Sequence, residues 1–183
     1  SIIHLEDMEH LRPSPTMYIG KLGNGSSHDD GIYVLIKEVI DNAIDEFTMG
    51  YGKSIEVTVD FAEKKVRIRD YGRGIPFGSL VTAVSRLNTG GKYDNKVFQK
   101  SIGLNGVGTK AVNALSSHFR IQSVRDGQTK VAIFAEGKLV EDMEVQPSTE
   151  QNGTLVEFVP DVKCFGDYHF VNDYIERSIW NYA

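Results

Sequence analysis

The chain has 183 residues, of which 40% are hydrophobic and 25% are charged, and its formal net charge is −5. That length fits one domain, large enough to bury a core without disulfides or metals as staples. The acidic balance argues against a module that grips nucleic acid by itself, because such modules are usually basic. A single cysteine excludes an internal disulfide. With no long apolar run, the sequence predicts a protein without a membrane segment, located in the cytoplasm.

The first predicted element is an amphipathic helix over residues 29–49. Apolar side chains recur there at the spacing of one helix face, Asp29 or Asp30 could cap the start, and Gly50 could end it. The other predicted elements are, in chain order, strands at 54–61 and 65–70, a loop at 71–78, a helix at 79–87, a glycine-punctuated loop at 89–108, a helix at 109–117, strands at 119–126, 128–136, 138–145 and 152–160, and an amphipathic helix at 167–183. This order predicts an α+β fold in which helices and a mixed, mostly antiparallel sheet form two layers.

Three polar residues of the first helix, Glu38, Asn42 and Asp45, share the face opposite its apolar stripe. A solvated polar face is the ordinary explanation. However, carboxylates three or four residues apart repel one another, and the lysines that usually alternate with them are missing. A carboxylate one turn from an amide oxygen also suits a hard cation such as Mg²⁺, which takes oxygen ligands. The stretch therefore leaves two interpretations open, a solvated face or a cation site.

Glycines crowd residues 103–108, G-L-N-G-V-G, just before a predicted helix. Such a loop can bind phosphate through free backbone N–H groups, although a plain surface loop has the same composition. It is not a P-loop, because Thr109 and Lys110 invert the required order, and it lacks the βαβ unit of a dinucleotide-binding motif. Five scattered histidines and one cysteine give no zinc site, and no G-x-S-x-G elbow is present.

Five motifs follow one another along the chain, E-V-I-D-N-A-I-D-E at 38–46, D-Y-G-R-G-I-P at 70–76, T-G-G-K-Y at 89–93, G-L-N-G-V-G at 103–108 and N-G-T at 152–154. Together they resemble the ATPase domain of bacterial type IIA topoisomerases, found in the gyrase B and topoisomerase IV B subunits. This GHKL superfamily also holds MutL mismatch-repair proteins, a heat-shock chaperone and histidine kinases. The resemblance runs from M-Y-I-G at 17–20 through the closing helix, and T-G-G-K and V-N-A-L-S point to the topoisomerase branch.

The resemblance implies a fold and a domain plan. The fold would be the Bergerat-type ATP-binding fold, a two-layer sandwich whose sheet is covered by helices on one face. Residues 1–183 would form a single ATP-binding domain, without the N-terminal arm and the transducer domain that complete the site in relatives. We therefore expect this chain alone to hydrolyse ATP weakly.

The resemblance also implies roles for individual residues. Glu38 would be the general base that activates water, Asn42 would ligate Mg²⁺, and Asp70 would accept a hydrogen bond from the adenine amino group. Thr154 would support that carboxylate and an ordered water, and Gly74 would let the purine approach the backbone. The other nucleotide-binding positions would be Asp45, Ile75, Pro76, Lys92, Leu104, Asn105, Gly106, Val107 and Gly108. The apolar walls would include Val39, Ile68 and Val156, and the pocket mouth would hold an ion pair of Arg73 with Glu46.

Three single positions depart from the family pattern, and Pro13-Ser14-Pro15-Thr16 stands in place of the usual R-P-G before M-Y-I-G. Asn105 stands where relatives often carry histidine, and Phe98 stands near a usual tyrosine. Lys130 replaces an arginine that lies by the pocket mouth in relatives. None of the three is the implied base, metal ligand or adenine reader.

The expected function is ATP binding and hydrolysis, coupled to DNA strand passage by a topoisomerase IV-like or gyrase-like enzyme. The implied ligands and partners are ATP, Mg²⁺, a topoisomerase A subunit, a second B subunit on ATP binding, DNA through the full-length enzyme, and aminocoumarin-type inhibitors of the ATP site. The alternative is a nucleotide-sensing module of a chaperone, a MutL-type repair protein or a histidine kinase. An interaction domain that has lost its nucleotide site is disfavoured, because Glu38, Asn42 and Asp70 are all present.

Overall fold

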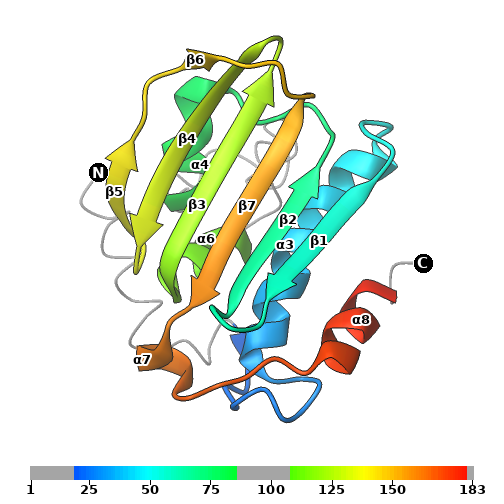
Figure 1. The fold of residues 1–183 in the computed structure, drawn as a ribbon, viewed down its shortest axis with the longest axis vertical. Coiled ribbons are helices and arrows are strands. Elements are labelled where there is room, and N and C mark those ends of the chain that lie inside the picture. Colours follow the sequence, from blue (N-terminus) through cyan, green and yellow to red (C-terminus); the bar gives the residue numbers. More distant parts are fainter. Residues whose placement is uncertain (1–18, 86–107, 181–183) are drawn as a thin grey trace, which may run out of the picture.

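The described residues, 19–85 and 108–180 of this computed structural model, include seven strands in the order β1-β2-β7-β3-β4-β5, with β6 paired to β4 (Figure 1). The strands are β1 Ile55–Asp60, β2 Lys65–Asp70, β3 Ser116–Arg125, β4 Gln128–Ala135, β5 Lys138–Asp142, β6 Gln146–Pro147 and β7 Gly153–Pro160. The helices are α3 Gly31–Thr48, the 3₁₀ turn η1 Phe77–Ser79, α4 Leu80–Ser85, α6 Gly108–Ala114, α7 Val162–Phe165 and α8 Asn172–Trp180. All pairings within the described ranges are antiparallel, so the sheet is not mixed there.

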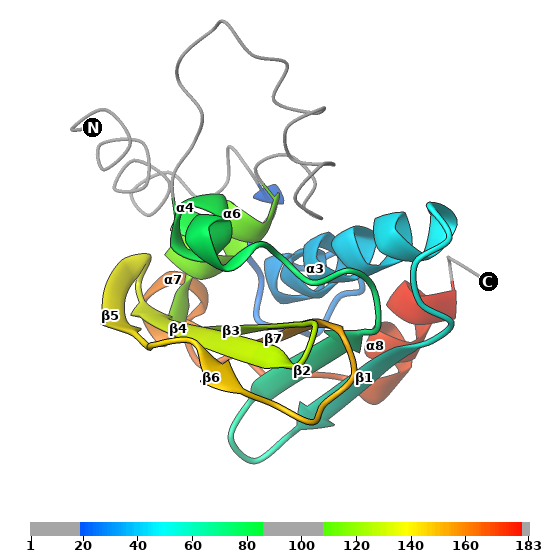
Figure 2. The ribbon, with the colours of Figure 1, turned by 90° about the horizontal axis from the view of Figure 1, so that it is seen from above.

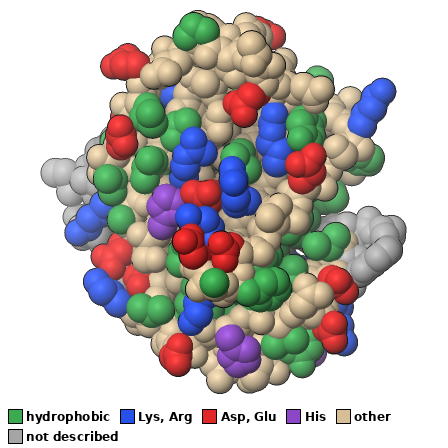
Figure 3. All heavy atoms as spheres, viewed as in Figure 1, with side chains coloured by type: hydrophobic (Ala, Val, Ile, Leu, Met, Phe, Trp, Pro, Cys, Tyr) green, Lys and Arg blue, Asp and Glu red, His purple; other side chains and the backbone are tan. Residues whose placement is uncertain are grey.

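Helices α3, α4 and α6 cover one face of the sheet (Figure 2). The opposite face carries charged side chains of both signs among hydrophobic ones (Figure 3). The alternation along β2 explains this division, because Val66 and Ile68 are buried whereas Arg67 between them is exposed. The predicted two-layer α+β sandwich, with helices on one face, is confirmed.

Helix α3 supplies the middle of the core. Its side chains Ile32, Leu35 and Ile36 are completely buried, and each such side chain contributes about 1.5–3 kcal/mol of transfer free energy. Asp30 precedes the helix, but its carboxylate accepts the N–H groups of Gly25 and Ser27 and so closes the preceding loop. None of the described helices is both long and apolar enough to span a lipid bilayer.

Strand register brings distant residues into one row at the end of the sheet. Antiparallel pairing places Asp70, the last residue of β2, opposite Thr154 of β7. The same Thr154 lies opposite Ser123 of β3. A turn that follows β2 is therefore held next to the ends of two other strands.

The predicted closing helix at 167–183 was wrong at its start. Helix α8 begins only at Asn172, and residues 166–171 before it have no regular secondary structure. Tyr168 and Phe170, two residues apart, are both buried, and the ring of Phe170 packs edge-on against Tyr33 of α3. Residues two apart lie on different faces of a helix, so this burial does not follow a helical period.

Other boundaries also differ from prediction, and three short elements were missed. The helix predicted at 109–117 ends at Ala114, because β3 already begins at Ser116, and the strand predicted at 138–145 ends at Asp142. The 3₁₀ turn η1, the short strand β6 and the one-turn helix α7 were not predicted. Of the glycine-punctuated loop predicted at 89–108, only Gly108 lies within the described residues.

Candidate functional site

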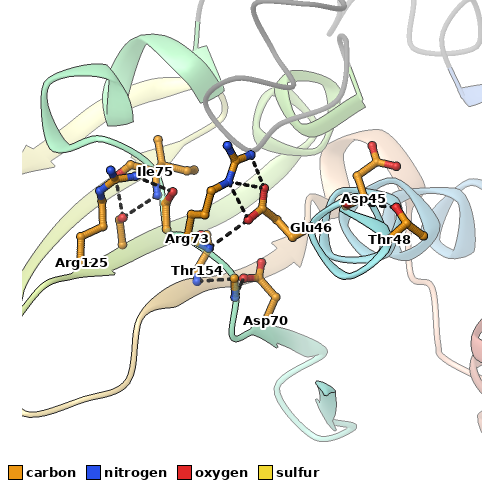
Figure 4. A network of polar contacts seen from close by, with 11 residues as sticks. Asp45, Glu46, Thr48, Asp70, Arg73, Ile75, Arg125 and Thr154 are labelled. Atoms are coloured by element: carbon orange, nitrogen blue, oxygen red, sulfur yellow. Dashed lines mark hydrogen bonds and ion pairs between the residues drawn. The ribbon is translucent and has the colours of Figure 1, made fainter. Parts of the chain in front are cut away.

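Asp70 is a nearly buried carboxylate at the end of β2, with 9% of its surface exposed. Its Oδ1 accepts the backbone N–H of Gly72 at 2.9 Å and that of Thr154 at 3.3 Å (Figure 4). Burial raises the pKa of Asp70 to about 6, and the nearby negative charge of Glu46 adds to the rise. No described residue donates a hydrogen bond to its second oxygen, Oδ2. The arrangement leaves one oxygen of a positioned carboxylate available to a donor on a ligand.

The turn after β2 is hydrogen-bonded to β3. Gly74 has a φ of +74°, and a methyl group on it would lie 2.7 Å from the carbonyl oxygen of Val124. The hydroxyl of Ser123 accepts the N–H of Ile75 at 2.7 Å and donates to its carbonyl at 2.6 Å. Arg125 donates to the carbonyl of Gly74 at 3.1 Å. The glycine is therefore required by the close approach of β3, whether or not a purine lies against it.

Arg73 and Glu46 form an ion pair between this turn and α3 (Figure 4). The distance from Arg73 Nη2 to Glu46 Oε1 is 2.6 Å, and the backbone N–H of Arg73 donates to Oε2 at 2.9 Å. Glu46 is only 3% exposed, and the guanidinium also lies over the ring of Tyr51. A methyl on Gly72 would lie 2.5 Å from Glu46 Oε2, so the turn packs directly on the carboxylate. One acidic residue of α3 is thus used to hold the turn that carries Asp70.

Two residues near the middle of α3 contact the start of α6. Glu38 is half-buried, and burial, followed by the charge of Asp41, raises the pKa of its carboxyl group. Its Oε2 would lie 2.0 Å from a methyl on Gly108. Asn42 is 6% exposed and donates from Nδ2 to the hydroxyl of Thr109, while its buried Oδ1 has no hydrogen-bond partner in the described part of the chain. An acidic group and an unsatisfied amide oxygen therefore lie one helical turn apart at the α3–α6 contact.

Lys110 follows on α6 and was noted in the sequence only as part of the rejected P-loop match. Its side chain is 2% exposed, and burial lowers its pKa to about 8. It forms no ion pair with any carboxylate in the described part of the chain. A buried ammonium group is costly, so Lys110 is an unusual feature of α6.

The remaining predicted residues fall into three groups. The predicted wall residues Val39, Ile68, Ile75 and Val156 are all buried in the same hydrophobic cluster. Pro76 is half-buried just before η1, and the half-buried Asp45 points away from Asp70 in Figure 4. The predicted phosphate-binding residues Lys92, Leu104, Asn105, Gly106 and Val107 lie outside the described residues, as does Phe98.

Lys130 is not the basic residue next to the β2 turn. Its ammonium group pairs with Asp142 of β5 at 3.0 Å. Arg125, at the end of β3, is the basic side chain bonded to Gly74. Sequence reasoning missed Arg125 and Ser123, because only the register of β3 on β7 reveals that these residues end beside Asp70.

Comparisons with known proteins agree with this geometry. The model of the histidine kinase-, DNA gyrase B- and HSP90-like ATPase family matches residues 27–163. Over 182 residues, the chain is 53% identical to the B subunit of DNA topoisomerase 4 from Borreliella burgdorferi, covering 100% of this chain and 30% of that protein. Over 180 residues, it is 36% identical to the B subunit of the type 2 topoisomerase from Aquifex aeolicus, covering 94% of this chain and 22% of that protein.

A solved structure is also similar. It is the 43K ATPase domain of Thermus thermophilus gyrase B in complex with an aminocoumarin, with a TM-score of 0.78 and 29% identity over 94% of this chain and 44% of that chain. The chain thus spans less than half the length of each of these relatives. Because the family model covers most of its length, the chain belongs to the histidine kinase-, DNA gyrase B- and HSP90-like ATPase family.

Proposed function

We propose that this chain binds ATP with Mg²⁺ between α3, α6 and the turn after β2, and that it hydrolyses the terminal phosphoanhydride. The observation that carries the proposal is Asp70, a buried carboxylate with one oxygen held by two backbone N–H groups, while its other oxygen accepts no hydrogen bond from a described residue. Family membership supports ATP as the ligand. Above the pKa of about 6, this group is an acceptor suited to the amino group of adenine.

The apolar residues around Asp70 suit the face of a purine ring. Val39, Ile68, Ile75 and Val156 belong to one buried cluster. Glu46, at the end of α3, is fixed beside the Asp70 turn by Arg73. Glu38 lies eight residues earlier, about 12 Å along the helix axis. Helix α3 can therefore lie beside the adenine ring near Glu46 and beside the phosphates near Glu38.

The residues at the α3–α6 contact fit a magnesium ion. The Oδ1 of Asn42 is a buried amide oxygen without a partner, and Mg²⁺ prefers oxygen ligands. Within the described ranges there is no group of three or more histidine, cysteine or acidic side chains that could hold a metal. We propose that Asn42 is the protein ligand and that phosphate oxygens and waters supply the others. The ion, when bound, would neutralise charge on the phosphates.

Glu38 is the proposed general base. Its pKa is raised, mainly by burial, and this increases its basicity towards a water proton. The family pattern supports phosphate binding by Lys92 and by the backbone of Leu104, Asn105, Gly106, Val107 and Gly108.

The similarity to topoisomerase B subunits supports a role for the complete protein. We propose that it couples ATP to DNA strand passage, with a topoisomerase A subunit and a second B subunit as partners, in the cytoplasm. DNA would be engaged by the full-length enzyme, because this chain carries a net charge of −5. The aminocoumarin bound to the Thermus relative supports the proposal that such compounds occupy the ATP site here.

Calorimetric titration of the 183-residue chain with a non-hydrolysable ATP analogue tests the nucleotide site. We expect saturable binding that Mg²⁺ strengthens. The variant Glu38→Gln should bind the analogue as the parent does and, in the full-length protein, release phosphate from ATP about 10²-fold or more slowly than the full-length parent, because the amide cannot accept the proton. Glu63→Gln, on the β1–β2 turn, is the matched control and should behave as the parent. Unchanged hydrolysis by Glu38→Gln would exclude Glu38 as the base.

A further inference from the structure

Thr109 contacts the proposed metal ligand. It is the second residue of α6, its side chain is only 2% exposed, and its hydroxyl accepts a hydrogen bond from Nδ2 of Asn42. The two residues are 67 positions apart, so this bond joins α3 directly to α6. Gly108, the residue before, packs against Glu38 of the same α3 face.

In this structure the hydroxyl of Thr109 meets the nitrogen of the Asn42 amide and not its oxygen. An asparagine amide has a nitrogen that only donates and an oxygen that only accepts, on opposite sides of one planar group. Because Thr109 takes the nitrogen of Asn42, the oxygen is turned to the other side. Among the described residues, that buried oxygen has no hydrogen-bond partner, which costs about 1–3 kcal/mol when no ligand satisfies it. A cation that met Oδ1 would remove this cost and favour the amide orientation that the structure shows.

We propose that Thr109 is a positioning residue that holds the Asn42 amide with Oδ1 towards Mg²⁺. This inference rests on the proposed function of Asn42 as the metal ligand. Groups that orient a metal ligand typically change metal affinity 10–100-fold when they are removed. A hydroxyl is required for this role, and neither the family motifs nor the glycine pattern pointed to it.

The test is the Mg²⁺ dependence of nucleotide binding by the 183-residue chain. Dissociation constants for the non-hydrolysable ATP analogue are measured with Mg²⁺ and with EDTA. The constant in EDTA divided by the constant in Mg²⁺ gives the ratio by which the metal strengthens binding. Thr109→Val keeps the shape of the side chain but cannot accept the hydrogen bond. It should lower the ratio about tenfold or more and leave the constant in EDTA within about twofold of the parent. Thr109→Ser should keep the parent ratio, and Thr58→Val, on the open face of the sheet, is the matched control.

A double variant separates positioning from packing. In the Asn42→Ala background, Thr109→Val should change the ratio no further, because the two residues act as one unit. An additive loss would show that Thr109 acts through α6 packing and would overturn the inference. Melting curves of the metal-free variants establish that each one is folded.

The outcomes distinguish this inference from the proposal on which it rests. If the parent shows no Mg²⁺ effect, or Asn42→Ala keeps the full effect, the metal role of Asn42 fails and the inference fails with it. If the effect is lost in Asn42→Ala but kept in Thr109→Val, only the inference about Thr109 is wrong. Loss in Thr109→Val with rescue in Thr109→Ser supports both.

Discussion

The carboxylate of Glu38 on α3 packs against the backbone of Gly108, the first residue of α6, so closely that a methyl there would lie 2.0 Å from Oε2. The residue before the described start of α6 belongs to the predicted phosphate loop. The contact therefore places the proposed base directly beside the end of that loop.

We predict that Gly108→Ala impairs hydrolysis more than folding. The atom in the way is the tip of a flexible side chain, so Glu38 can swing aside at little cost to stability. A displacement of about 1 Å at a reacting group can cost about 10²-fold in rate. We expect phosphate release to fall about 10–100-fold, with the melting temperature nearly unchanged. Gly78→Ala, where a methyl meets nothing within 4 Å, is the control. Parent-like hydrolysis by Gly108→Ala would show that Glu38 needs no exact position.

Nucleotide binding should weaken in acid because of Asp70. Its pKa in the folded chain is about 6, raised from 3.8, so it becomes protonated as the pH falls below 6. A protonated carboxyl group loses its value as an acceptor, and the dissociation constant should rise about tenfold per pH unit below 6. Adenosine is the probe, since it has no phosphate that titrates in this range, and its binding is followed by NMR. A constant affinity from pH 7 to 5 would contradict the assignment.

The same shift affects the stability of the fold with the opposite sign. Because the folded state binds the Asp70 proton more tightly than the unfolded chain does, the penalty for burying this charge is present above pH 6. It is relieved as the pH falls from 6 towards 3.8. Acid should therefore weaken adenine binding over a range in which Asp70 itself does not destabilise the domain.

Lys110 should limit the stability of the ligand-free chain. Its pKa is lowered from 10.5 to about 8, so the folded state disfavours the ammonium form. The shift corresponds to a penalty on the order of 3 kcal/mol, complete below pH 8 and lost as the pH rises from 8 towards 10.5. Lys110→Met should raise the melting temperature by several degrees at pH 7 and by much less at pH 10. Lys138→Met, on the exposed strand β5, should change it little, and a lower melting temperature for Lys110→Met would contradict the argument.

Local patterns predicted the elements better than the contacts between them. The apolar period of residues 29–49 predicts α3 within two residues at its start and one at its end, and alternation predicts the β1–β2 hairpin. These patterns are informative because an element buried on one face carries apolar residues at the period of a helix or a strand. The predicted start of the closing helix was wrong because Tyr168 and Phe170 are buried from an irregular segment that directly precedes α8.

The site could be predicted only where its residues fall within a continuous motif. Glu38, Asn42 and Glu46 share one helix, and Asp70 lies in the motif that includes Arg73. Ser123, Arg125 and Thr109 reach the same region through strand register and helix contact, which no local pattern reports. Lys130 lies opposite Ser123 in the pairing of β3 with β4, and its ammonium group pairs with Asp142.

The central claim is that Asp70 recognises adenine. Calorimetric titration of Asp70→Asn with a non-hydrolysable ATP analogue in Mg²⁺ at pH 7.5 tests it most directly, with Asp173→Asn on α8 as the matched control. The amide keeps the size of the side chain but loses the charge and one acceptor, so we predict that binding to Asp70→Asn falls below detection while the control binds as the parent does. An Asp70→Asn variant that is folded and binds the analogue with the parent's affinity would contradict the account.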